Sequence, residues 1–137
     1  MTVKAILKKV KEDAQVIDTR ITYKFMRQIV GGFIQMVPIG PCVDVVCNEN
    51  GMFAGPNQTP LPQNVAGYLG DILLVASDDE CECRGMTEEE IRKGLAYLER
   101  FKDEVHSGPE IGFITGSEAT LFLEAIRNHR REIWDSL

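Results

Sequence analysis

Apolar and polar residues alternate near the start of the chain in a pattern typical of a β-hairpin followed by a helix. Residues 3–8 are predicted to form a strand, and residues 14–18 are expected to pair with it across a short turn. A helix is predicted over residues 23–30, because Thr22 can cap its start and Gly31 can adopt the left-handed conformation that often ends a helix.

The middle of the chain is expected to supply the centre of the sheet. Strands are predicted over residues 33–37 and 42–48, and Asn50-Gly51 favours a tight hairpin turn into a return strand at 52–54. Residues 72–76 are apolar at every position, which is typical of a strand buried on both faces. We therefore expect this last strand to be central.

The last third of the chain is predicted to be helical. Thr87 and Glu90 have the spacing of a capping box, in which each side chain accepts a hydrogen bond from a backbone amide at the helix start. Apolar residues at helical spacing continue this helix toward the breaker at 107–109, and a second helix is expected from Ser117. The whole pattern predicts an α+β fold, a mostly antiparallel sheet with helices packed on one face.

Composition narrows the class of protein. A chain of 137 residues with 44% hydrophobic and 26% charged residues is typical of one globular domain. Its net charge of −6 argues against general nucleic-acid binding, which requires clustered Lys and Arg. No apolar run reaches the roughly 20 residues that span a membrane, and no apolar signal segment follows the first lysines. We expect a cytoplasmic protein with no membrane association and with reduced cysteines.

Several short motifs form a set within the first hundred or so residues. They are Ile29-Val30-Gly31-Gly32-Phe33-Ile34, Asn48-Glu49-Asn50-Gly51, Pro56-Asn57, Gly70-Asp71-Ile72-Leu73-Leu74-Val75 and Met86-Thr87-Glu88-Glu89-Glu90. On these motifs the chain resembles an uncharacterised domain-of-unknown-function family known chiefly from phages, plasmids and related mobile elements. The resemblance implies a small α+β domain of mobile-element ancestry and implies no activity. Residues 1–137 are then a single domain, with a family-like core at 1–106 and a C-terminal helical extension at 107–137.

Four cysteines match the number that a structural zinc site would use, but their spacing is poor. Known sites favour two to four residues between paired cysteines; four residues separate the first pair, at the limit of this range, and only one separates the second. On one strand the first pair would also point to opposite faces. Half-buried or buried thiols are therefore the default interpretation, and no metal or cofactor is expected. The cysteines are Cys42, Cys47, Cys81 and Cys83.

Catalytic patterns are equally weak. A thiol nucleophile would need His106 or His129 as its base, and both positions are typical of structural histidines. The acidic residues 78–82 lack the glycine and final glutamate of an EF-hand loop, and the glycine-rich segment 108–117 lacks the lysine of a P-loop. The sequence predicts no catalytic residue and favours a protein that is not an enzyme.

The loop predicted at 55–66 is the best candidate for a binding site, since long loops inside compact domains are often functional. With its flanking turns it offers four candidate binding residues, whose amides and phenol can contact a ligand or partner. An alternative is that the asparagines only satisfy the backbone of their own turns. The four candidates are Asn48, Asn57, Gln58 and Tyr68.

These observations favour a non-enzymatic binding module of mobile-element origin, whose partner is an unknown host or element-encoded protein or a small ligand. Two alternatives stay open. One is a small metal- or thiol-dependent enzyme. The other is a structural homodimer paired through the C-terminal helix, in which Trp134 would be at least partly exposed in the monomer.

Overall fold

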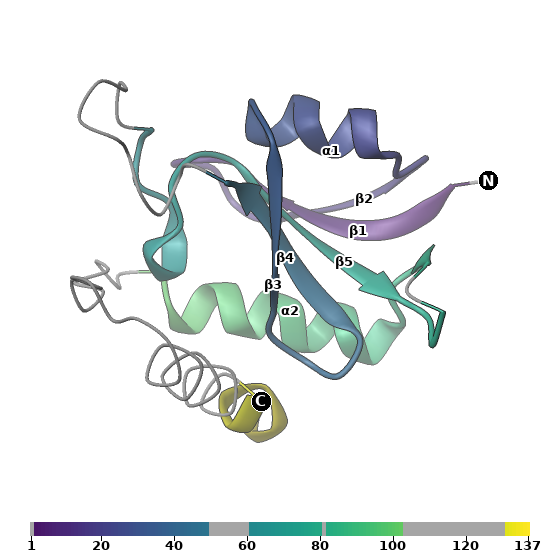
Figure 1. The fold of residues 1–137 in the computed structure, drawn as a ribbon. Coiled ribbons are helices and arrows are strands. Elements are labelled where there is room, and N and C mark those ends of the chain that lie inside the picture. Colours follow the sequence, from purple (N-terminus) through teal and green to yellow (C-terminus); the bar gives the residue numbers. More distant parts are fainter. Residues whose placement is uncertain (1, 50–60, 81, 103–130) are drawn as a thin grey trace, which may run out of the picture.

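The computed structural model describes residues 2–49, 61–80, 82–102 and 131–137 (Figure 1). These residues form a six-stranded sheet whose path runs β2-β1-β5-β4-β3, with β6 paired to β5, and every described pairing is antiparallel. The predicted α+β class with a mostly antiparallel sheet is therefore confirmed. The strands are β1 (Val3–Lys8), β2 (Gln15–Thr19), β3 (Ile34–Pro38), β4 (Val43–Asn48), β5 (Ile72–Ser77) and β6 (Cys83–Arg84), and the helices are α1 (Tyr23–Val30), the 3-10 helix η1 (Val65–Gly67), α2 (Glu88–Arg100) and the helical residues 131–136.

β5 lies at the centre of the sheet, as its uniformly apolar sequence predicted. It pairs with β1 on one side, where Leu7 lies opposite Leu73, and with β4 on the other, where Val45 lies opposite Leu74. Residues 72–76 are at most 2% exposed, because both faces of this strand are covered.

β4 forms a hairpin with β3, the strand that precedes it in the chain. Its two edges are occupied by β3 and β5, so that Val46 lies opposite both Met36 and Leu73. The described hairpin is therefore the one formed with the preceding strand, and the return strand predicted at 52–54 lies outside the described residues. β3 itself begins and ends one residue later than predicted, since proline is tolerated at the end of an edge strand.

Helices cover both faces of the sheet, so the prediction that they pack on one face is wrong (Figure 1). Successive residues of β1 point to opposite faces. Ala5 and Leu7 belong to the cluster that α1 covers through Val30, whereas Ile6 belongs to the cluster that α2 covers through Leu98. Both faces of the sheet carry apolar side chains, so each requires a helix to exclude water.

The helix ends follow the sequence signals. The Oγ1 atom of Thr22 accepts a hydrogen bond from the amide of Phe25, and Gly31 ends α1 with φ of 76°. Thr87 and Glu90 form both hydrogen bonds of the capping box at the start of α2. The helix predicted from Ser117 lies mostly outside the described residues, which include only its last part. None of the helices in the described part of the chain is long and apolar enough to span a membrane.

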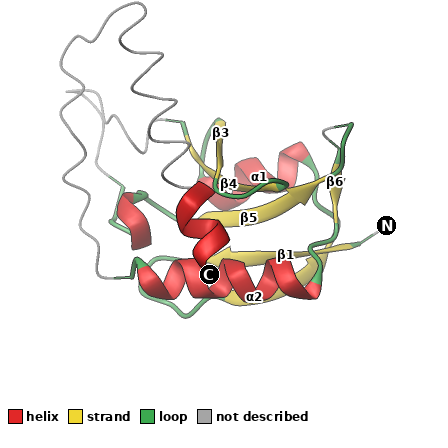
Figure 2. Cartoon of the chain, turned by 90° about the horizontal axis from the view of Figure 1, so that it is seen from below, coloured by secondary structure: helices red, strands yellow, loops and turns green. Residues whose placement is uncertain are grey.

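The helix at the C-terminus lies beside α2 (Figure 2). The guanidinium of Arg92 donates a hydrogen bond to the carbonyl of Leu137, and the ammonium of Lys93 lies 6.0 Å from the centroid of the Trp134 ring. Trp134 is only 3% exposed within the single chain. The partly exposed tryptophan expected of a dimer-forming helix is therefore not observed.

Candidate functional site

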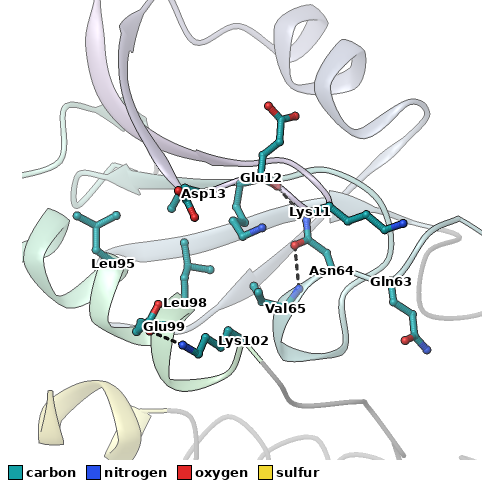
Figure 3. A pocket seen from close by; sticks show the side chains of 12 residues that line it. Lys11, Glu12, Asp13, Gln63, Asn64, Val65, Leu95, Leu98, Glu99 and Lys102 are labelled. Carbon is teal, nitrogen blue, oxygen red and sulfur yellow. Dashed lines mark hydrogen bonds and ion pairs between the residues drawn. The ribbon is translucent and has the colours of Figure 1, made fainter.

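A pocket of about 810 Å³ opens where the β1–β2 turn, the segment before η1 and the second half of α2 meet (Figure 3). Ligand pockets in proteins commonly fall in this range of volumes. Its walls combine apolar side chains from α2 with charged and amide side chains from the turn and the loop. The lining residues are Lys8, Lys11, Glu12, Asp13, Ala14, Gln63, Asn64, Val65, Leu95, Leu98, Glu99 and Lys102.

Lys8 is the unusual residue of this pocket, because lysine is seldom buried. It is the last residue of β1 and lies on the same sheet face as Ile6, and only 9% of its surface is exposed. Its ammonium donates a hydrogen bond of 2.7 Å to the carbonyl of Lys9. Among the residues that the structure describes, no carboxylate lies within ion-pair distance of this ammonium.

Asn64 fixes the loop wall of the pocket. Its Nδ2 atom donates hydrogen bonds of 2.9 Å to the carbonyls of both Lys8 and Gly70, and its Oδ1 atom accepts one of 2.8 Å from the amide of Val65. Its own amide donates to the carbonyl of Tyr68. One side chain therefore links the end of β1, the start of η1 and the residues before β5.

The β1–β2 turn forms a second wall and is held in place from a distant part of the chain. The carboxylate of Asp71 accepts a hydrogen bond of 2.9 Å from the amide of Val10. Lys11 adopts φ of 62°, and Ala66, just beyond the loop wall, adopts φ of 56°. Positive φ at a residue other than glycine is strained and is concentrated at functional sites. These two are the only such residues in the described part of the chain; Lys11 lines the pocket, and Ala66 directly follows Val65, which also lines it.

The third wall comes from α2 and combines an apolar surface with one ion pair. Leu95 and Leu98 contribute apolar surface, and the ammonium of Lys102 lies 2.8 Å from the Glu99 carboxylate. In Figure 3 the side chain of Glu12 extends away from both leucines. Lys8 and Lys11 are therefore the cations that this pocket leaves without an ion-pair partner among the described residues.

The binding residues predicted from the sequence do not meet at this pocket. Asn48 is 6% exposed, and its Nδ2 atom donates a hydrogen bond of 2.9 Å to the Val30 carbonyl at the end of α1. Tyr68 is 2% exposed and belongs to the core cluster beneath α2. Asn57 and Gln58 lie outside the described residues. The geometry of Asn48 agrees with the alternative interpretation, in which its amide satisfies backbone groups.

Sequence reasoning missed Lys8 and Asn64. Asn64 does fall within the loop at 55–66 that was singled out, and its place before an apolar Val65 is typical of a residue that caps a turn. Lys8 ends an alternating strand, and nothing in its local sequence separates a buried lysine from an exposed one.

The cysteines in the described part of the chain occupy three separate environments. Cys47 is buried and its thiol donates to the carbonyl of Gln35, Cys42 is half-buried, and Cys83 is exposed. Partial burial raises the pKa of the Cys83 thiol. No group of three or more His, Cys, Asp or Glu residues among those described is placed to bind a metal ion, and Cys81, His106 and His129 lie outside them.

A smaller cavity of about 280 Å³ lies beside the start of α2, and an ion pair forms part of its lining. The Arg84 guanidinium donates to both oxygens of Glu90, at 2.7 and 3.0 Å. Burial raises the pKa of the Glu90 carboxyl, but the hydrogen bonds from Arg84 and Thr87 outweigh this effect and the pKa is lowered. Since both charges are already satisfied, this cavity offers less to a ligand than the pocket at Lys8.

The comparisons with known proteins agree with the resemblance in one respect, namely that most of the chain is a domain of unknown function. No curated protein and no solved structure matches the chain. The sequence model of the family described as DUF3846, a domain of unknown function, matches residues 2–102 and thus includes every residue that lines the pocket. Because this match covers well over half of the 137 residues, the chain belongs to the DUF3846 family.

Proposed function

We propose that the protein is a non-enzymatic binding module of mobile-element origin that holds a small molecule with an anionic group in the pocket beside Lys8. The observation that carries this proposal is the largely buried side chain of Lys8, which lines a pocket and whose ammonium has no counter-ion among the described residues. A buried charge is destabilising unless it is paired. A carboxylate or phosphate group in the pocket would supply the missing partner.

The shape of the pocket supports a small ligand rather than a flat protein surface. Walls from three parts of the chain surround it, and long-range hydrogen bonds from Asn64 and Asp71 fix two of them. A site fixed before binding loses little conformational entropy when the ligand enters. Leu95 and Leu98 would contact the apolar part of such a ligand while Lys8 and Lys11 contact its anionic group.

Titration of the isotopically labelled protein with defined probes tests the proposal. Inorganic phosphate and succinate serve as anionic probes, and putrescine serves as a cationic probe of similar size. We expect both anions to shift the amide resonances of Lys11, Val65 and Leu98, and putrescine to leave them in place. Binding of the anions should weaken about tenfold or more in Lys8→Met, because a charge-assisted hydrogen bond is worth about 1.5–3 kcal/mol.

Lys9→Met is the matched control, since Lys9 is the exposed neighbour of Lys8 and does not line the pocket. Its anion affinity should equal that of the unmodified protein. Absence of anion-induced shifts at the pocket, or an unchanged response in Lys8→Met, would overturn the proposed site.

The mobile-element origin is a separate part of the proposal, and it is supported by the resemblance of the sequence motifs. Sequencing the genes on either side in the source genome tests it. We expect neighbours that encode phage or plasmid functions, and a setting of housekeeping genes would count against this origin.

A further inference from the structure

The aromatic rings of Tyr23 and Phe33 flank Arg27 on the outer surface of α1. The guanidinium carbon of Arg27 lies 4.5 Å from the centroid of the Phe33 ring and 5.9 Å from that of Tyr23. Both rings are large apolar groups left in solvent, with Tyr23 54% and Phe33 56% exposed. An arginine stacked on aromatic faces keeps its N–H groups free at the edges of the plane, where they can bind a carboxylate.

The charge around this surface differs in sign from the charge of the whole protein. Residues 19–43 include Arg20, Lys24 and Arg27 and contain no acidic residue, although the protein has a net charge of −6. All three cations are exposed. Within the described part of the chain, no carboxylate lies within ion-pair distance of any of them. The cationic segment is therefore available to a partner.

This surface is separate from the pocket at Lys8. α1 covers one face of the sheet, whereas the pocket is built with α2 on the opposite face (Figure 1). Asp18 is the acidic residue nearest to the surface along the chain, five positions before Tyr23, and the amide of Glu49 donates a hydrogen bond to the carbonyl of Phe33. Neither carboxylate lies within ion-pair distance of Lys24 or Arg27, so both cations are available to a partner.

We propose that the surface formed by Tyr23, Lys24, Arg27 and Phe33 binds an acidic segment of a partner protein, whose carboxylates contact the cations and whose apolar residues contact the two rings. Arg and aromatic residues are the groups most often enriched in protein interfaces. Three cations are few for a nucleic-acid site, and the negative charge of the remaining protein would repel a polyphosphate backbone. Charge complementarity therefore favours an acidic protein segment.

Fluorescence anisotropy with defined probes on the full chain tests this proposal. The probe is a fluorescein-labelled peptide with a Glu-Glu-Leu repeat. A peptide with a Gln-Gln-Leu repeat reports the contribution of charge, and single-stranded oligothymidylate reports nucleic-acid binding. We expect the acidic peptide to bind, the glutamine peptide to bind more weakly, and added salt to weaken the acidic complex. Equal binding of both peptides, tighter binding of the oligonucleotide, or no binding of the acidic peptide would overturn the proposal.

Variants locate the site. Arg27→Gln should weaken binding of the acidic peptide about tenfold, as expected for loss of a charged interface anchor. Arg27→Lys keeps the charge but loses the planar stacking group, so its affinity for the acidic peptide should lie between those of the unmodified protein and Arg27→Gln. Arg131→Gln removes an exposed cation elsewhere and Lys8→Met alters only the pocket, and both should bind the peptide unchanged. Full affinity in Arg27→Gln, or an equal loss in Arg131→Gln, would refute this location.

Discussion

Gly40 lies directly against the indole ring of Trp134. A Cβ atom at Gly40 would come within 2.7 Å of Cε2 and 2.9 Å of Cδ2 and Nε1 of that ring. Gly40 lies in the turn between β3 and β4, whereas Trp134 belongs to the helical residues 131–136 beyond the family match. Close packing of these two residues thus joins the C-terminal helix to the core of the sheet.

Gly40→Ala should therefore displace the C-terminal helix. An added methyl group in close-packed surroundings is destabilising by about 1–3 kcal/mol, and the rigid indole cannot move without leaving its buried position. Trp134 is the only tryptophan, so its fluorescence reports on this site alone. We expect a red-shifted emission maximum and a lower midpoint of denaturant unfolding.

Gly85→Ala is the matched control for this experiment. A Cβ atom there would meet its nearest neighbour at 3.5 Å, which is ordinary contact. Its stability should stay within about 0.5 kcal/mol of the original, with unchanged emission. If Gly40→Ala behaves in the same way as this control, the contact with Trp134 is not important for stability.

Lys8→Met should stabilise the protein while it removes anion binding. Lys8 is largely buried and its ammonium has no ion-pair partner among the described residues, so an apolar side chain of similar length should be less costly to bury there, and we expect a gain of about 1 kcal/mol in the free energy of unfolding. Saturating phosphate should reduce the difference in stability between Lys8→Met and the unmodified protein, because phosphate stabilises only the protein that binds it. Chemical denaturation with and without phosphate measures both effects. A loss of stability in Lys8→Met would show that its ammonium is already well paired.

Asn64→Asp should be strongly destabilising at neutral pH. The amide donates to two carbonyls, of Lys8 and Gly70, and a carboxylate would place oxygen against oxygen at 2.9 Å. We expect a loss of about 2 kcal/mol or more. The carboxyl should have a raised pKa in the folded state, since only its protonated form can donate. The loss of stability in Asn64→Asp is then smallest below the pKa of about 3.9 that an aspartic acid has in the unfolded chain. It grows as the pH rises through the pKa of the folded state.

Gln63→Glu makes the same chemical change at the neighbouring exposed residue of the pocket wall. Thermal unfolding from pH 3 to 8 compares the two variants. The control should follow the unmodified protein within about 0.5 kcal/mol. Matching pH profiles for both variants would contradict the role assigned to the Asn64 amide.

Glu90→Gln should reduce stability in a way that depends on pH. The carboxylate accepts hydrogen bonds from Arg84 and from the amide of Thr87, and its pKa is lowered. A depressed pKa stabilises the folded state above the unfolded value of about 4.3, and this stabilisation is lost as the pH falls through the folded pKa. At pH 7 we expect a loss of about 1–3 kcal/mol, which combines the cap and the ion pair.

The difference between Glu90→Gln and the unmodified protein should shrink below about pH 4. Glu88→Gln is the control in the same helical turn, where Glu88 is exposed. It should lose no more than about 0.5 kcal/mol at any pH. A difference for Glu90→Gln that stays constant down to pH 2 would rule out the carboxylate charge as its origin.

Asn48→Ala should destabilise the protein without affecting anion binding. The buried amide holds the Val30 carbonyl at the end of α1, and leaving that carbonyl unsatisfied should reduce stability by about 1–3 kcal/mol. Gln35→Ala, at an exposed position of β3, should change stability little. The phosphate titration should be the same in both variants. Loss of phosphate binding in Asn48→Ala at unchanged stability would instead support Asn48 as a binding residue.

The sequence by itself determined the elements whose signals lie within a few residues of one another. The caps at Thr22, Gly31 and Thr87 depend on hydrogen bonds between residues at most four or five positions apart, and the structure confirms each of them. The central position of β5 also follows from its own composition, since a strand apolar on both faces is stable only between two neighbours.

Only the tertiary structure decided which strand pairs with β4, that helices cover both faces, and where the pocket lies. Asn50-Gly51 signals a turn but cannot show that β3 and β5 occupy both edges of β4. Lys8 and Asn64 are 56 positions apart, and the amide of one contacts the carbonyl of the other. The burial of Lys8 arises because this loop and α2 cover the end of β1. Such burial depends on contacts between distant segments, which no local pattern of polar and apolar residues encodes.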